Sequence, residues 1–275
     1  MANMGQRGLS PLARFLGRGV PMGLRERWRE LWNRPEELEP ARKLELASGY
    51  NVRELGGYAV EQGVTSYRRF VRSGGLDMLS AQDQRRLYDY GVRLVLDLRG
   101  NHEVSVAADK IQQMPGVRFC HVPLFDIDLS DPSLGSDELG GSYHTLGYLT
   151  MLANREAVRK AFLFFATAKE GECVLFHCAA GMDRTGMMAM LLLGLVGASN
   201  ERIVADYCYS SGSCAEVDGI VYKGKRPVRR ELELRLDAIT TVLDRLEEGY
   251  GTIERYLLSC GVEQRALERV RGHLL

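Results

Sequence analysis

The stretch that decides the fold is Val174-Leu175-Phe176-His177-Cys178-Ala179-Ala180-Gly181-Met182-Asp183-Arg184-Thr185-Gly186. An apolar run ends in Cys178, a short loop of small residues follows, and Arg184 stands six positions after the cysteine. Residues 185–196 are then apolar on nearly every side, which predicts a buried helix. This order indicates a strand, an anion-binding loop and a helix, because a helix N-terminus presents backbone N–H groups and a positive dipole end.

The residue types in this loop fit phosphoryl transfer. Cys178 as a thiolate is the nucleophile, and the helix N-terminus, the inward N–H groups and Arg184 favour its ionised form. Arg184 can bind two phosphoryl oxygens in a bidentate fork. We expect Thr185 to donate its hydroxyl to the sulfur as the sulfur leaves, and His177 to orient the loop. The predicted phosphate-binding residues are Ala179, Ala180, Gly181, Met182, Asp183, Arg184 and Thr185.

The loop resembles the Cys-x5-Arg-Thr/Ser signature of protein tyrosine and dual-specificity phosphatases. Three more matches, in the order of the family, resemble its bacterial branch of atypical tyrosine and phosphoinositide phosphatases. They are Asn51-Val52-Arg53-Glu54-Leu55-Gly56-Gly57-Tyr58, Asp97-Leu98-Arg99 with Glu103, and Tyr250-Gly251-Thr252-Ile253-Glu254-Arg255-Tyr256-Leu257. The resemblance implies cysteine-dependent hydrolysis of phosphate monoesters through a phosphocysteine intermediate. It covers the chain from about Asn51 to the end.

The expected fold class is α/β, with a central, mostly parallel sheet flanked by helices and a helical C-terminal part. The patterns predict strands at 67–73, 92–98, 117–122 and 173–176. The resemblance places the first of these in a small strand layer beside the main sheet. Helices are predicted from Ser80 to Gly91, over 151–169, over 185–196, from Ser199 or Asn200 toward Tyr209, and over 232–246.

The chain divides into an N-terminal extension, residues 1–45, and a phosphatase domain, residues 46–275. The extension includes a short amphipathic helix whose apolar face is formed by Leu24, Trp28, Leu31 and Trp32. We interpret this helix as docking its tryptophans on the domain. The alternative is a helix that binds a membrane surface or a partner.

The composition excludes several classes of function. Acidic and basic residues number 36 each, so the charge balance does not suggest a nucleic-acid partner. The six cysteines and five histidines are dispersed without Cys-x2-Cys pairing, so no metal site is expected, and the mechanism needs no cofactor. The apolar run over 187–196 is far short of the roughly 20 residues that a membrane span needs, so we expect no stable membrane insertion. A catalytic thiolate favours a reducing, cytoplasmic location. The oligomeric state is open.

The general acid has several candidates, because the sequence contains no Trp-Pro-Asp tripeptide. Asp183 within the loop is the candidate that the resemblance favours. Asp97, at the end of a predicted strand, is the second. Asp126 and Asp128, after Pro123, resemble the acid loop of dual-specificity enzymes. The predicted catalytic residues are therefore Cys178, Arg184, Asp183 and Asp97.

One departure from the resemblance concerns the substrate. Relatives that hydrolyse phosphoinositides usually have lysine where this chain has Met182, so a cation is missing from the expected pocket rim. A basic cluster from Lys223 to Arg230 could compensate. Phosphotyrosine in proteins is the leading substrate, and phosphoserine, phosphothreonine, phosphorylated lipids and small molecules follow. The rival interpretations are a pseudophosphatase that binds phosphorylated partners without turnover, and sulfur chemistry of the rhodanese type.

Overall fold

The structure is a computed structural model that describes residues 42–125, 143–216 and 229–275, with the backbone alone for 211–216 and 229–232. Several predictions concern residues outside this description. They are the helix with Trp28 and Trp32, the acid candidates Asp126 and Asp128, and the side chains of the basic cluster from Lys223 to Arg230.

The main sheet has five strands in the order β1-β4-β7-β5-β6. Strand β1 pairs antiparallel with β4, and the other neighbours pair in parallel, which confirms the predicted mostly parallel sheet. A separate pair is formed by β2 and β3. The bounds are β1 (Arg53–Glu54), β2 (Ala59–Val60), β3 (Gly63–Val64), β4 (Phe70–Ser73), β5 (Val92–Asp97), β6 (Arg118–His121) and β7 (Cys173–His177).

The predicted place of β4 in a small layer beside the main sheet is wrong. It lies within the main sheet, between β1 and β7. Phe70 and Val71 point to opposite faces and both are fully buried, so both faces of this strand are covered. The small layer consists of β2 and β3.

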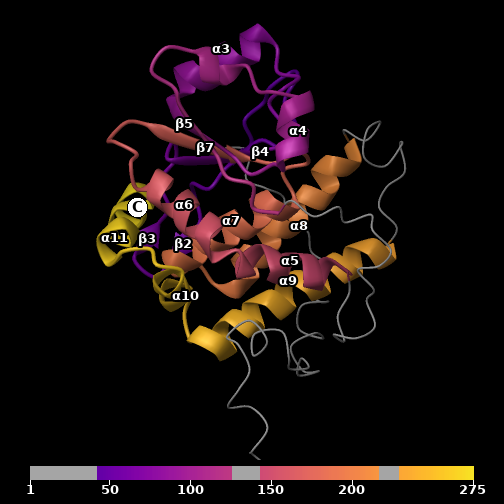
Figure 1. The fold of residues 1–275 in the computed structure, drawn as a ribbon, viewed down its shortest axis with the longest axis vertical. Helices are drawn as coiled ribbons and strands as arrows, with labels where there is room; N and C mark the ends of the chain where they lie inside the picture. Colours follow the sequence, from indigo (N-terminus) through magenta and orange to yellow (C-terminus); the bar gives the residue numbers. More distant parts are fainter. Residues whose placement is uncertain (1–41, 126–142, 217–228) are drawn as a thin grey trace, which may run out of the picture.

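Helices cover both faces of the sheet (Figure 1). Helix α3 lies on one face, and α6, α7 and the C-terminal helices lie on the other. The bounds are α3 (Ala81–Tyr90), α4 (Asn101–Val106), a 3-10 turn (Ile111–Gln113), α5 (Tyr143–Ala153), α6 (Arg155–Phe165), α7 (Asp183–Leu195), α8 (Asn200–Glu216), α9 (Arg229–Tyr250), α10 (Ile253–Ser259) and α11 (Gln264–Leu274).

Two helix predictions need correction. The single helix expected over 151–169 is divided into α5 and α6 at Asn154, whose side chain accepts a hydrogen bond from Ala157 N and so caps α6. Helix α8 continues past Tyr209, where the predicted helix was expected to end, to Glu216.

Alternation along the strands divides the apolar core between the two faces. In β7, Val174 and Phe176 belong to the larger cluster on the side of α5–α11, and Cys173 and Leu175 belong to the smaller cluster under α3. Helix α7 contributes a nearly continuous apolar surface to the larger cluster, as its sequence predicted. The larger core therefore holds β7 and α7 firmly, on both sides of the loop that joins them.

The C-terminal motif ties the last helices to this core. The Tyr256 hydroxyl donates to Leu152 O at 2.7 Å, and Arg155 Nη2 donates to the Tyr250 hydroxyl at 2.6 Å. Both tyrosines belong to the Tyr250–Leu257 stretch, so that part of the resemblance has a packing role.

The described start of the chain lies against the sheet edge. Lys43 forms a β-bridge with Arg53, and Arg42 Nη2 donates to Gly57 O at 3.1 Å. The division at residue 45 remains a prediction. Among the described residues, none of the helices combines the length and the apolar character needed to cross a bilayer.

Replacing Leu191 by alanine tests the central position of α7. Leu191 is fully buried in α7, so we expect the free energy of unfolding to fall by about 2–5 kcal/mol in urea denaturation. Met78 is 72 % exposed, and Met78→Ala should change it by less than about 0.5 kcal/mol. Equal losses in the two variants would contradict the buried position of α7.

Candidate active site

The loop after β7 leaves the middle of the sheet at its carboxyl edge, where ligands of open α/β sheets bind. His177, the last residue of β7, is in register with Ser73 of β4 and with Asp97 of β5. The segments that follow those two strands therefore flank the loop.

The carbonyl group of Ala179 is held from one side of the loop. It accepts hydrogen bonds from the Gly75 backbone N–H at 2.8 Å and from the Tyr50 hydroxyl. The same hydroxyl lies 3.1 Å from Gly75 N, and a Cβ at Gly74 would overlap the Tyr50 ring. The glycine pair after β4 thus lets Tyr50 reach the loop.

The next carbonyl groups are held by Asn51 and Arg72. Asn51 Nδ2 donates to Ala180 O at 3.0 Å and to Gly181 O at 2.9 Å. Arg72 Nη2 donates to Gly181 O at 2.8 Å and to Met182 O at 3.4 Å. Asn51 has a φ of 53°, a left-handed conformation that asparagine adopts more readily than most residues.

These contacts orient the whole loop. In a trans peptide unit the carbonyl of one residue and the N–H of the next point in opposite directions, and the described chain has only trans peptides. Because the carbonyls of residues 179–182 point to the scaffold, the N–H groups of residues 180–183 point to the other side. Successive N–H groups that point to one side form an arrangement suited to an oxyanion.

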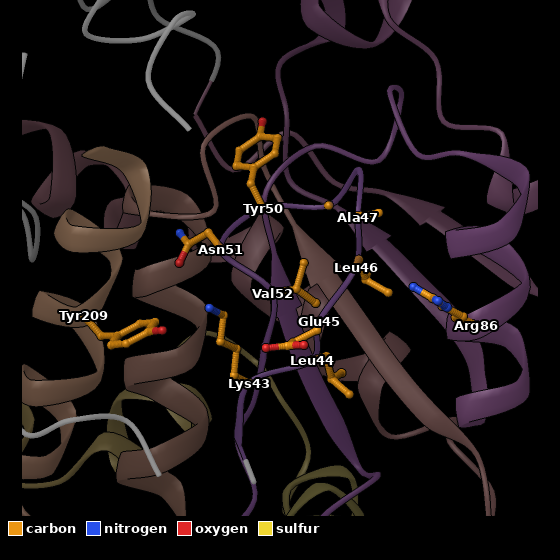
Figure 2. Close-up of a pocket in the computed structure, with 11 residues that line it drawn as sticks. Lys43, Leu44, Glu45, Leu46, Ala47, Tyr50, Asn51, Val52, Arg86 and Tyr209 are labelled. Carbon is orange, nitrogen blue, oxygen red and sulfur yellow. The ribbon is translucent and has the colours of Figure 1, made fainter. Parts of the chain in front are cut away.

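Figure 2 shows Tyr50 and Asn51 beside a cavity of about 430 Å³. The cavity is also lined by Lys43, Glu45 and Tyr209, and it lies along the edge of the sheet between α3 and α8. The Tyr50 ring extends away from the other lining residues. Tyr50 and Asn51 are therefore shared between this cavity and the loop.

Gly181 is required by a close approach of two backbones. Its φ is 68°, and a Cβ there would lie 2.5 Å from the carbonyl carbon and oxygen of Ser73. The loop can rest on the end of β4 only if this residue has no side chain.

Arg184 is held by Glu103 of α4. Both terminal nitrogens of Arg184 donate to the Glu103 carboxylate, one of them at 2.9 Å, and Glu103 Oε2 also accepts from Gly100 N at 2.7 Å. Burial would raise the pKa of Glu103, but Arg184 holds it below its usual value. Burial would lower the pKa of Arg184, but Glu103 and the Cys178 sulfur raise it. The cation is therefore fixed within electrostatic reach of the thiol.

Asp183, the first residue of α7, has three side-chain partners. Its Oδ1 accepts from the hydroxyl of Tyr148, from the hydroxyl of Tyr207 at 3.3 Å, and from Arg235 Nη1. Burial would raise the pKa of Asp183, but Arg235 and the Tyr148 hydroxyl lower it. The side chain still has 28 % of its surface exposed, so it can reach a bound ligand.

Asp97 is placed differently, in a fully buried cluster. Arg99 donates to it from its backbone N–H at 2.9 Å and from Nη2 at 2.7 Å. Arg99 Nη2 also lies 3.0 Å from Asp109 Oδ1, and His177 Nε2 lies 2.9 Å from Asp109 Oδ2. Burial would raise the pKa of Asp97, but Arg99 lowers it.

The carboxylates of Asp97 and Asp109 and the His177 ring have ligand atoms within 4.8 Å of one another, a spacing that could suit a metal ion. Arg99 already supplies a cation to both carboxylates. The arrangement therefore fits an ion-pair cluster that fixes His177 immediately before Cys178.

Two further loop side chains are buried. The Thr185 hydroxyl has no hydrogen-bond partner in the part of the chain that the structure describes, so its expected bond to the departing sulfur stays a prediction. The Met182 side chain was expected at the pocket rim, but it is 2 % exposed and lies in the larger core. An apolar side chain at the start of α7 is more stable when it packs in the core than when it is exposed to water at the pocket rim.

The sequence model of a tyrosine phosphatase family matches residues 44–275. The chain belongs to this tyrosine phosphatase family. A Cupriavidus necator protein, named provisionally as a tyrosine-protein phosphatase, is 30% identical over 254 residues, covering 82% of this chain and 85% of its own. A tyrosine-protein phosphatase of Nostoc commune is 30% identical over 222 residues, 74% of each chain. A triple specificity protein phosphatase of Mycobacterium tuberculosis is 26% identical over 276 residues, covering 84% of this chain and 98% of its own.

Membership in the family makes this protein a phosphatase, and hence a hydrolase that acts on a phosphorylated substrate. Cys178 begins the loop after β7, Asp183 and Arg184 lie in the first turn of α7 that ends it, and Asp97 lies in the buried cluster. Sequence reasoning assigned no role to several residues around the loop. They are Tyr50, Arg72, Tyr148, Asp206, Tyr207 and Arg235. Only the Asn51–Tyr58 and Asp97–Glu103 motifs signalled that distant segments meet the loop.

The close approach at Gly181 predicts that Gly181→Ala lowers phosphatase activity by more than its loss of stability would explain. In Gly181→Ala a methyl group would force the loop from Ser73, so phosphatase activity should fall by about a hundredfold or more. Gly116→Ala is the matched control, because Gly116 has a φ of 75° and nothing within 4 Å of its would-be Cβ.

Both variants should lose about 1–2 kcal/mol of unfolding free energy from the left-handed backbone, and Gly181→Ala should lose more because its Cβ would also collide with the Ser73 backbone. Thermal denaturation and steady-state rates, measured on the same samples, separate the two effects. Similar activity in Gly181→Ala and Gly116→Ala would contradict the proposed contact with Ser73.

Proposed function

We propose that this protein hydrolyses phosphate monoesters, chiefly phosphotyrosine in proteins, through a phosphocysteine intermediate on Cys178. The observation that carries the proposal is the orientation of the loop: scaffold donors hold the carbonyls of residues 179–182. The opposed N–H groups and Arg184 form a cradle for the phosphoryl oxygens, where negative charge gathers in the transition state.

The first step transfers the phosphoryl group to sulfur. The Cys178 thiolate attacks phosphorus, an S–P bond forms, and the P–O bond to the tyrosine oxygen breaks. Protonated Asp183 gives its proton to that leaving oxygen. Glu103 holds Arg184 through both terminal nitrogens, and the remaining N–H groups of the guanidinium, including Nε, bind two phosphoryl oxygens.

The second step releases phosphate. The Asp183 carboxylate takes a proton from a water molecule as that water attacks phosphorus, and the S–P bond breaks to restore the thiolate. Thr185 is suited to donate its hydroxyl to the departing sulfur, since that hydroxyl is buried and no described residue accepts from it. Asp183 ends the cycle protonated and Cys178 ends it ionised, so protons balance.

The choice of Asp183 as the acid rests on exposure. Asp183 keeps 28 % of its side-chain surface exposed on the loop itself, whereas Asp97 is fully buried and bonded to Arg99. In this proposal Asp97 fixes Arg99 and His177 below the loop, and it does not contact substrate.

The substrate preference rests on the loop side chains. No basic residue stands between Cys178 and Arg184, so the loop offers only one side-chain cation to the substrate. This favours a monophosphorylated residue such as phosphotyrosine over a multiply phosphorylated lipid. Phosphoserine, phosphothreonine and phosphoinositides stay as alternative substrates, and the triple specificity in the name of the Mycobacterium relative supports a substrate range wider than phosphotyrosine.

The proposed location is a reducing compartment, the cytoplasm. Catalysis requires Cys178 as a free thiol, and the described cysteines, Cys120, Cys173, Cys178, Cys208 and Cys260, are all free. An oxidising compartment would expose the nucleophile to disulfide formation.

Hydrolysis of a phosphotyrosine peptide by the wild type and by Cys178→Ser tests the proposed function. We expect wild-type turnover in chelator and reductant, and a loss of several orders of magnitude in the variant. Acid quenching during turnover should trap phosphate on wild-type Cys178. A phosphoinositide assayed in parallel measures the preference.

Peptide binding without turnover by the wild type would instead favour a pseudophosphatase. Sulfur transfer from thiosulfate without phosphatase activity would favour rhodanese-type chemistry.

The Arg235–Asp183 pair predicts a pH dependence. Because Asp183 must be protonated to act as the acid, kcat/KM should fall as pH rises above the pKa of Asp183. Arg235 lowers that pKa, so Arg235→Met should raise it and move the falling limb to higher pH. Asp183→Asn should remove this limb and lower kcat by about 10²–10⁴-fold. Because the pKa of Asp183 lies below its usual value in the wild type, profiles that begin well below about pH 4 and extend to neutral pH measure the shift, and an unmoved limb in Arg235→Met would exclude Asp183 as the acid.

A further inference from the structure

The loop rests on a network of charged side chains buried beneath it. Arg53 of β1 and Arg72 of β4 have no exposed surface, and Asp206 of α8 is 2 % exposed. Burial of three charges is unfavourable unless each is paired and hydrogen-bonded, so such a network persists only with well-defined geometry.

Asp206 binds both arginines. Its Oδ1 accepts from Arg53 Nε at 2.9 Å and from the Tyr58 hydroxyl at 2.9 Å, and its Oδ2 accepts from Arg72 Nη1. Its backbone carbonyl accepts from Arg53 Nη2 at 2.7 Å. The Ser210 hydroxyl, one turn further along α8, accepts from Arg53 Nη2 at 2.8 Å and from Arg72 Nη2 at 3.3 Å.

The other ends of both arginines lead to the loop. Arg72 Nη2 donates directly to Gly181 O, and Arg53 Nη1 donates to Asn51 Oδ1. That bond leaves Asn51 Nδ2 to donate to the carbonyls of Ala180 and Gly181. Because a guanidinium group is planar and rigid, fixing one of its nitrogens fixes the direction of the others.

Charge makes Asp206 the member on which the network depends. Burial and the nearby Arg53 both lower the pKa of Arg72, so the two cations oppose each other. Burial would raise the pKa of Asp206, but Arg53 and Arg72 lower it to about 2. Asp206 is thus ionised at neutral pH and is the carboxylate to which both arginines are bonded.

We propose that Asp206 is a positioning residue for phosphoryl transfer, which holds Arg53 and Arg72 so that they turn the loop carbonyls away from the substrate. This inference rests on the proposed function, because it concerns the cradle for the same phosphoryl group. Asp206 reaches the loop only through the two arginines, so its effect is on loop geometry. It also makes helix α8 the support of the loop.

Replacement of Asp206 by asparagine tests the proposal. Asparagine keeps the shape and leaves two buried cations without their carboxylate. We expect kcat toward p-nitrophenyl phosphate to fall by about tenfold to a hundredfold. The inhibition constant of vanadate, which imitates the five-coordinate transition state, should rise by a similar factor. Ser210→Ala removes a neutral acceptor from both arginines, so it should shift both values in the same direction by a smaller factor, even if Asp206→Asn folds poorly.

Glu54→Gln is the matched control. Glu54 is also a fully buried carboxylate on β1, but it accepts from the Arg68 N–H and the Tyr90 hydroxyl, away from the loop. Its replacement should lower the melting temperature and leave kcat and vanadate inhibition within about twofold of the wild type. All assays are run well below the lowest melting temperature.

Three outcomes decide the matter. Selective loss of kcat and vanadate affinity in Asp206→Asn and Ser210→Ala supports the positioning role. Wild-type kcat in both variants, or equal losses in Glu54→Gln, overturns it. If the wild type hydrolyses nothing, calorimetry of vanadate binding still applies: tight binding by the wild type that weakens in Asp206→Asn supports the positioning role while the proposed function fails.

Discussion

A loop of successive N–H groups binds an oxyanion only when the carbonyl groups of the same peptides are kept away from it. Carbonyls left without donors in the protein interior would be costly, so each needs a partner on the far side of the loop. Here Tyr50, Asn51, Arg72 and the Gly75 N–H supply those donors. Tyr50 and Asn51 and the end of β4 supply these donors, and helix α8 supports them through Asp206.

The same requirement explains the charges under the site. A neutral donor such as Asn51 reaches two carbonyls, but the Gly181 carbonyl also accepts from the guanidinium of Arg72 in β4. A buried guanidinium needs a carboxylate, and Asp206 provides it. Although the whole chain carries no net charge, two cations and one anion are concentrated directly behind the loop. The surplus positive charge favours binding of a phosphoryl group.

The exposed side of the site uses two further ion pairs with different consequences. Glu103 holds Arg184 in place, so the residue proposed to contact phosphoryl oxygens is fixed before substrate arrives. Arg235 pairs with the proposed acid Asp183 and lowers its pKa, so a change at Arg235 would change the proton affinity of the acid. Helix α8 contributes to both sides through neighbouring residues, since Asp206 lies under the loop and Tyr207 contacts Asp183.

The order of strand, loop and helix around Cys178 could be predicted because its determinants are contiguous: an apolar run, small residues and a helix start within 13 residues of the printed sequence. The parallel sheet and the buried α7 followed from the same local patterns. The place of β4 in the main sheet and the break at Asn154 did not, because they depend on which surfaces each segment buries. The sequence by itself determined the chemistry that we propose for the loop, since that proposal needs only Cys178, Arg184 and their spacing. Only the tertiary structure decided which distant polar groups hold the loop, because pairing between buried charges depends on packing in space and leaves no periodic signal along the chain.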